Sequence, residues 1–197
     1  MPELIVVHGS PGNGKSTISR ELHKRLKTPW FEFGWIPEFT SLNPYTQISP
    51  KEEEQISFEN LVCVCKNYIK HGFESIIISD LNDIRMLDIP IYFKWIPFVI
   101  FTLYSENDEI IKKRIMDRNN GNLFKNFEQS IHTNKLIVNR KLLPNEYRIR
   151  SDEQTVDEIT NKIVQILKSH QFESSFNPNE YDSIDYYSYF NENGTYF

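Results

Sequence analysis

The chain has 197 residues, 39% of them hydrophobic and 25% charged, and a formal net charge of −5. This length suits one sizeable core rather than two full domains, and the lack of any run of about 18 apolar residues argues against a membrane-spanning helix. The excess of acidic residues lies wholly in residues 171–197, so residues 1–170 are formally neutral and lack the basic surplus of a nucleic-acid-binding surface.

The first predicted elements alternate between strand and helix. Residues 4–7 form an apolar run typical of a buried parallel strand, and a helical pattern begins at Ser16. Because the strand follows Met1 so closely, we expect no signal peptide and a cytoplasmic protein. Residues 29–35 predict a second strand, and residues 49–72 predict a helix that opens with a serine capping box.

The alternation continues along the chain. The remaining predicted strands cover residues 75–79, 98–103 and 147–150. The remaining predicted helices cover roughly 106–118, a stretch ending near Leu143, and 155–166. Ser105 is expected to cap the helix at 106–118. This order predicts an α/β fold, with a central parallel sheet of about five strands and helices on both faces.

Cysteine and aromatic residues are placed unusually in two segments. Cys63 and Cys65 sit two apart in a helical pattern, a spacing that disfavours both a disulfide and a zinc site. Residues 171–197 contain five Tyr and four Phe. We expect this acidic segment to be a tail that packs loosely on a domain formed by residues 1–170. The alternative is that its aromatic side chains cover a substrate cleft or a subunit contact.

Residues 8–17, HGSPGNGKST, carry the strongest functional signal. They match G-x-x-x-x-G-K-[ST] without a mismatch, directly after an apolar strand and at the start of an amphipathic helix. In that setting backbone N–H groups hold nucleotide phosphates, Lys15 reaches the β- and γ-phosphates, and the Ser16 hydroxyl binds Mg²⁺. The predicted nucleotide-binding residues are Gly9, Ser10, Pro11, Gly12, Asn13, Gly14, Lys15, Ser16 and Thr17.

A second metal-associated residue is predicted at Asp80, directly after the strand at 75–79. P-loop proteins place an aspartate at the tip of a neighbouring strand, where its carboxylate holds Mg²⁺ or the waters around it. Asp83 competes for this role, and an aspartate here can also simply cap the following turn. We predict that Ser16 and Asp80 bind the metal.

The P-loop, the SIIISD strand and a later R-x-x-x-R together resemble the small P-loop phosphotransferases, such as gluconate and shikimate kinases, nucleotide kinases, chloramphenicol phosphotransferase and zeta-toxin kinases. The resemblance spans roughly residues 3–168, and only the P-loop is specific. It implies the P-loop NTPase fold, ATP and Mg²⁺ as cofactors, and an adenine contact near residues 150–154. It also implies that Arg114 and Arg118 share one helix face at the base of a lid starting at 119–122.

The sequence departs from this group after the second strand, where many relatives carry an aspartate that accepts the proton of the substrate hydroxyl. Here the segment reads FEFGWIPEF, with Glu32 and Glu38 as its acids. We prefer Glu38 as the general base because it lies just past the strand, where open α/β sheets bind substrates. Glu32 and Asp80 are alternatives. Trp35 and Phe39 fall where the acceptor pocket is expected, which favours an acceptor with an aromatic part.

A kinase therefore fits the sequence better than other nucleotide-binding proteins. Residues 134–137 begin like the N-K-x-D motif of GTPases, but Ile137 stands in place of the aspartate. The alternative is a nucleotide-binding module without catalysis. We predict phosphoryl transfer to a small molecule, such as a nucleoside, a nucleotide or another hydroxyl compound, and leave the oligomeric state open. The predicted catalytic residues are Lys15, Glu38, Asp80, Arg114 and Arg118.

Overall fold

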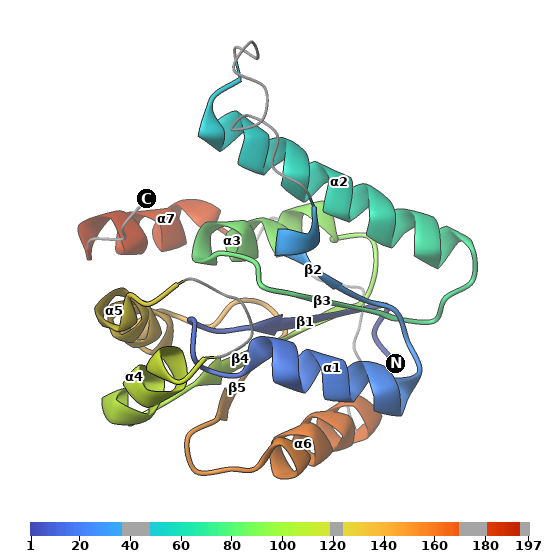
Figure 1. Ribbon diagram of the computed structural model, residues 1–197. Helices are drawn as coiled ribbons and strands as arrows, with labels where there is room; N and C mark the ends of the chain where they lie inside the picture. Colours follow the sequence, from blue (N-terminus) through green and yellow to red (C-terminus); the bar gives the residue numbers. More distant parts are fainter. Residues whose placement is uncertain (37–47, 119–123, 170–180, 194–197) are drawn as a thin grey trace.

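The core of the fold is a sheet of five parallel strands in the order β2–β3–β1–β4–β5 (Figure 1). A computed structural model describes residues 1–36, 48–118, 124–169 and 181–193. The strands are β1 Leu4–His8, β2 Trp30–Glu32, β3 Ile76–Ser79, β4 Phe98–Tyr104 and β5 Glu146–Arg150. The predicted parallel sheet is confirmed.

Alternate strand residues point to opposite faces of this sheet, and each face is covered by helices. In β1, Leu4 and Val6 belong to the core cluster that contains side chains of α2 (Pro50–Lys70) and α3 (Asp83–Tyr92). Ile5 and Val7 belong to the cluster that contains side chains of α1 (Lys15–Leu26) and α6 (Val156–Ser169). Figure 1 shows these two helix layers on either side of the strands. Burial on both faces explains why the strands read as continuous apolar runs.

The chain order places the loop after β1 at the centre of the carboxyl edge of the sheet. In register, Val7 of β1 lies beside Ser79 of β3, and His8 lies beside Thr102 of β4. Strands β2 and β3 lie on one side of β1, and β4 and β5 lie on the other. Helices α4 (Asp108–Met116) and α5 (Phe127–Asn139) flank the same edge (Figure 1). Open α/β sheets bind ligands in the crevice formed at such a switch point.

A buried ion pair anchors the edge strand β5. The guanidinium of Arg140 donates to both carboxylate oxygens of Glu146 at 2.7 and 2.8 Å, and the Thr102 hydroxyl donates to the same carboxylate at 2.5 Å. Burial by itself would raise the pKa of Glu146, but the hydrogen bonds and the positive charge of Arg140 outweigh it and lower that pKa.

The last helix that the structure describes is part of the core. Residues 183–192 form helix α7 (Ser183–Glu192), and its Tyr186 and Phe190 are 6% and 1% exposed in the cluster shared with α2 and α3. The hydroxyl groups of Tyr181 and Tyr186 donate to backbone carbonyls in α3 and just after α5. The expectation of loose packing is therefore wrong for this helix, because its aromatic side chains complete an apolar layer. The division of the chain at residue 170 stays a prediction.

Several boundaries differ from the prediction. Helix α3 was not expected, since its short sequence contains Pro90, which occupies the last turn. The strand predicted at 29–35 ends at residue 32 and continues as a short 3-10 helix, η1 (Phe33–Trp35). Helix α5 ends at residue 139 instead of near 143. Asn107, and not Ser105, caps α4, while the Ser105 hydroxyl accepts from the backbone N–H of Asn107.

Other local predictions are confirmed. The capping box predicted at the start of α2 forms, with Ser49 paired to Glu52, and a second capping box pairs Thr155 with Glu158 at the start of α6. Both cysteines are free thiols. Within the ranges that the structure describes, no helix combines the length and the apolar character required to cross a membrane.

Candidate functional site

The P-loop curls tightly between β1 and α1 because its glycines adopt backbone angles that other residues disfavour. Gly9 has φ 138°, and a Cβ atom at this position would lie 2.3 Å from the backbone oxygen of Leu103. Gly14 has φ 87° and is the N-cap of α1, so the first N–H groups of that helix face the loop. The loop is thus shaped as an anion-binding cradle at a helix N-terminus.

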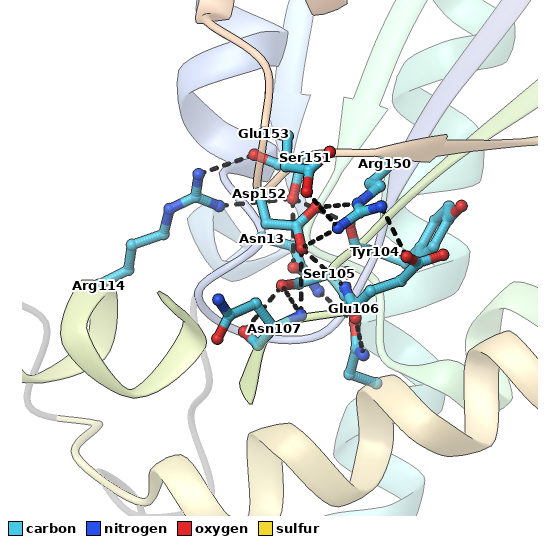
Figure 2. A network of polar contacts seen from close by, with 11 residues as sticks. Asn13, Tyr104, Ser105, Glu106, Asn107, Arg114, Arg150, Ser151, Asp152 and Glu153 are labelled. Atoms are coloured by element: carbon cyan, nitrogen blue, oxygen red, sulfur yellow. Dashed lines mark hydrogen bonds and ion pairs between the residues drawn. The ribbon is translucent and has the colours of Figure 1, made fainter. Parts of the chain in front are cut away.

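Buried side chains behind the loop hold it in this shape. The Asn13 amide donates to the Ser10 hydroxyl and to Asn134 Oδ1, each at 2.9 Å, and accepts from the Ser151 hydroxyl at 3.3 Å. Asn134 in turn donates to the backbone oxygen of Ser105 at 2.8 Å and accepts from its N–H at 3.1 Å. Figure 2 shows Asn13 at the centre of this network.

This network assigns a structural role to two side chains of the loop. Ser10 and Asn13 are 2% and 1% exposed and their side chains bond to protein, so these side chains support the loop from behind. Asn134 belongs to the stretch that begins like the N-K-x-D motif of GTPases. It lies inside helix α5. No local pattern in the sequence connects position 134 to position 13.

A cleft of about 840 Å³ opens in front of the loop and runs along the carboxyl edge of the sheet. Its walls come from the P-loop, from the ends of β2 and β3, from α4 and the residues after it, and from the segment joining β5 to α6. The lining residues are Pro11, Gly12, Asn13, Gly14, Lys15, Ser16, Thr17, Ile18, Glu32, Asp80, Arg114, Arg118, Phe124, Ser151, Gln154, Val156 and Ile159. The structure thus brings most of the predicted site residues together.

Lys15 and Asp80 face each other across this cleft. The Lys15 ammonium lies 3.4 Å from a carboxylate oxygen of Asp80, with side-chain exposures of 9% and 50%. Asp80 has φ 64°, a left-handed conformation that aspartate tolerates better than most residues and that turns the chain at the end of β3. Its competitor Asp83 is engaged elsewhere, since it pairs with the buried imidazole of His8 at 3.0 Å. Of these two acids, only Asp80 lines the cleft beside Lys15.

The two arginines reach the cleft in different ways. Arg114 donates to the backbone oxygen of Ser151 at 2.7 Å (Figure 2) and to the backbone oxygen of Gly12 at 3.4 Å. Helix α4 ends two residues before Arg118, so the expectation that both arginines share one helix face is wrong. Burial lowers the pKa of both guanidinium groups, an effect that the charge of Asp80 opposes at Arg118. Both remain cationic, since an arginine stays protonated even when buried.

Glu32, the last residue of β2, lines the cleft together with Asp80. Its Oε1 atom is shielded from solvent and has no hydrogen-bond partner among the described residues. Glu38, the preferred base in the sequence, lies outside the described residues, as do Phe39 and the start of the predicted lid. Trp35 is 54% exposed and packs against Trp30 in a tilted arrangement with ring centroids 5.0 Å apart, while Phe33 lines a second cavity. Trp35 is therefore not the pocket wall that the sequence suggested.

The other end of the cleft is more apolar. Ser151 and Gln154 belong to the segment where the resemblance implies an adenine contact, and Val156 and Ile159 add apolar surface from α6. The backbone around Ser151 is fixed by Arg114 and by a bond from its own N–H to the Tyr104 oxygen at 2.8 Å. A flat heterocycle would find both polar and apolar contacts here.

Comparison with known proteins supports the fold but gives no match in sequence. No protein-family model and no curated protein matches the chain. A sugar kinase from Janibacter sp. HTCC2649 has a TM-score of 0.61 at 19% identity, over 85% of this chain and 95% of its own. A gluconokinase from Sinorhizobium meliloti 1021 has a TM-score of 0.59 at 13% identity, over 86% and 98%.

Two further solved structures give similar values. Shikimate kinase from Acinetobacter baumannii has a TM-score of 0.55 at 19% identity and covers 88% of this chain and 96% of its own. The tunicamycin resistance protein of Deinococcus radiodurans has a TM-score of 0.59 at 15% identity, over 85% and 96%. The chain therefore has the α/β P-loop fold of the small P-loop kinases.

Proposed function

We propose that this protein is a kinase that transfers the γ-phosphoryl group of ATP, with Mg²⁺, to a hydroxyl group of a small molecule. The observation that carries the proposal is that one cleft is lined by the P-loop with Lys15, by Arg114 and Arg118, and by Glu32 and Asp80. The neighbours in fold are named as sugar, gluconate and shikimate kinases, which supports phosphoryl transfer as the reaction.

The residues of the cradle fit a nucleoside triphosphate. The glycine-lined loop and the start of α1 offer N–H groups to the phosphates, and Lys15 adds a positive charge that is 8% exposed. Ser16 and Asp80 offer a hydroxyl and a carboxylate, the oxygen donors that Mg²⁺ prefers, in the same cleft. Bound Mg²⁺ would neutralise charge on the phosphates. The base of the nucleotide would lie toward Gln154 and Val156.

Glu32 is our proposed general base, ahead of Glu38. Its side chain lines the cleft together with Asp80, where the hydroxyl of an acceptor can donate to the carboxylate. The hydroxyl gives its proton to the Glu32 carboxylate while its oxygen bonds to the γ-phosphorus. The bond from that phosphorus to the β–γ bridging oxygen breaks, and the electron pair leaves with ADP. Lys15 and Arg118 offset the negative charge on the transferred group.

The experiment is a screen with γ-labelled ATP and Mg²⁺ over nucleosides, nucleotides, sugars, sugar acids, aminoglycosides and phenicols. We expect transfer to one of these classes. Lys15→Ala should weaken ATP binding, and Glu32→Gln should lower kcat by about 10²- to 10⁴-fold with little change in ATP affinity. Glu38→Gln is the matched comparison for the assignment of the base.

Three outcomes would contradict parts of this proposal. Unchanged ATP affinity in Lys15→Ala would refute the cradle. A full loss of turnover in Glu38→Gln together with normal turnover in Glu32→Gln would move the base to Glu38. Tight ATP binding without transfer to any acceptor would favour a nucleotide-binding module without catalysis.

A further inference from the structure

A buried polar pair lies directly behind the P-loop, outside the main cleft. The Nε2 atom of His8 lies 3.0 Å from the Oδ1 atom of Asp83, and the two side chains are 2% and 18% exposed. His8 is the last residue of β1 and immediately precedes Gly9, whereas Asp83 is the first residue of α3. Neither is among the described residues that line the main cleft, so the proposed reaction gives this pair no direct task.

The pair joins the central strand to a helix that packs on one face of the sheet. Alternation along β1 places His8 on the same face as Leu4 and Val6, which belong to the core layer shared with α2 and α3. The other ring nitrogen of His8, Nδ1, is shielded from solvent and has no hydrogen-bond partner among the described residues. Within that part of the chain, Asp83 is therefore the polar group that orients the imidazole ring.

The segment that carries Asp80 is anchored on β1 at both of its ends. One end is Ser79 of β3, which lies beside β1 in register. The other end is Asp83, which is held by His8. Residues 80–82 alone connect these two anchors, and so short a link has little conformational freedom once both of its ends are fixed. The contact between His8 and Asp83 thus limits where Asp80 can lie.

Asp80 needs such an anchor because little else holds it in place. Its φ of 64° is left-handed, a conformation that persists in a residue other than glycine where the surrounding structure imposes it. Its carboxylate lies 3.4 Å from the Lys15 ammonium, but the side chain is 50% exposed, and a partly exposed ion pair contributes little. The position of this carboxylate is therefore set mainly by the backbone that carries it.

We propose that His8 and Asp83 are positioning residues that act through the turn between β3 and α3 to hold the Asp80 carboxylate beside the P-loop, where it serves Mg²⁺. This inference rests on the function proposed above, in which Asp80 is associated with the metal. Because His8 also leads into the P-loop, one contact fixes the metal-associated carboxylate and the phosphate-binding loop relative to each other.

The test replaces both members of the pair by leucine. Exchanging a buried polar pair for apolar residues of similar volume is often neutral for stability, so we expect His8→Leu/Asp83→Leu to fold. Calorimetric titrations with a non-hydrolysable ATP analogue at a series of Mg²⁺ concentrations give the Mg²⁺ concentration required for half-maximal affinity. This concentration should rise by at least about tenfold in the double variant. Affinity without Mg²⁺ should change by less than about threefold, because the loop keeps its own residues.

A conservative variant separates positioning from simple packing. His8→Gln keeps an amide nitrogen near the place of Nε2, so its Mg²⁺ requirement should stay within about threefold of the wild-type value. Asp83→Ala provides a second disruptive variant, which should raise the requirement as the double variant does. In turnover with labelled ATP, both disruptive variants should lose activity at limiting Mg²⁺ and regain most of it at saturating Mg²⁺.

Glu146→Gln is the matched control, because it breaks a pair of similar burial, with Arg140 at 2.7 Å, that anchors the edge strand β5. It should lower the free energy of unfolding in urea and leave the Mg²⁺ requirement unchanged. An equal rise of that requirement in Glu146→Gln would show that general destabilisation explains the effect, and would overturn the inference.

The remaining outcomes separate this inference from the kinase function. An unchanged Mg²⁺ requirement in both disruptive variants, with phosphoryl transfer intact, would overturn the positioning role and leave the kinase function standing. The expected rise in a protein that transfers phosphate to no acceptor would support the positioning role and overturn the kinase function. Nucleotide binding that does not depend on Mg²⁺ in the wild type would overturn both the inference and the metal-associated role of Asp80.

Discussion

Replacing Asn134 by leucine should loosen the phosphate-binding loop, although Asn134 does not line the cleft. The side chain is 3% exposed and makes three hydrogen bonds, one to Asn13 and two to the backbone of Ser105. Leucine has a similar volume, so the substitution removes these bonds without opening a large cavity. Each buried polar group left without a partner costs about 1–3 kcal/mol. Because the N–H and the carbonyl of Ser105 both lose their partner, the free energy of unfolding should fall by about 2–6 kcal/mol.

The measurements are urea denaturation followed by tryptophan fluorescence, and calorimetric titration with an ATP analogue. We expect nucleotide affinity to fall by at least about tenfold, because the Asn13 amide then loses its bond to Asn134 and keeps only those to Ser10 and Ser151. Lys135→Ala is the control. Lys135 is exposed and pairs with Asp108 at 2.6 Å on the surface, an interaction worth about 0–1 kcal/mol. A free energy of unfolding of Asn134→Leu within about 1 kcal/mol of the wild-type value, together with unchanged nucleotide affinity, would refute the supporting role of the network.

Three further predictions concern the loop, the last helix and the buried ion pair. Gly9→Ala should abolish nucleotide binding, because its Cβ would collide with a backbone oxygen, whereas Gly14→Ala meets no atom within 4 Å and should cost only about 1–2 kcal/mol of backbone strain; equal effects in titration calorimetry would contradict this. Phe190→Ala should lower the free energy of unfolding in urea by about 3–5 kcal/mol. Ile184 is 68% exposed on the same helix, so Ile184→Ala should lower it by less than about 0.5 kcal/mol. An unchanged stability in Phe190→Ala would show that the helix packs only loosely on the domain. Since folding lowers the pKa of Glu146, its stabilising contribution is present above the unfolded value of about 4.3 and is lost as the pH falls further; the free energy of unfolding should fall more steeply from pH 5 to pH 3 in the wild type than in Glu146→Gln, and parallel curves would exclude this linkage.

The sequence predicted the strands and the P-loop well because both are local patterns. A run such as LIVV is buried on both faces, so its apolar character is continuous and easy to recognise. The capping boxes at Ser49 and Thr155 involve residues three apart, and the P-loop fits in nine residues. Positions near in sequence carry the whole signal in each case.

The segments that the sequence predicted badly depend on contacts made elsewhere in the fold. Helix α3 contains Pro90 and is stabilised by burial of its apolar side chains against α2 and α7. Helix α7 looked like an acidic tail, but Tyr186 and Phe190 complete the core layer on the α2 side of the sheet. Neither partner surface can be recognised from the local sequence.

The candidate site also has a part that is local in sequence and a part that depends on the fold. The sequence by itself determined the P-loop, which we propose holds phosphates, because its glycines, Lys15 and Ser16 are contiguous in the chain. Only the tertiary structure decided which acid faces that cradle, since the parallel sheet brings the ends of β2 and β3 beside the loop after β1. It also turned Asp83 toward His8 and left the carboxylate of Glu32 at the cleft. Side chains that converge from separate strands leave no spacing pattern in the chain, so their meeting is fixed by sheet order and not by sequence distance.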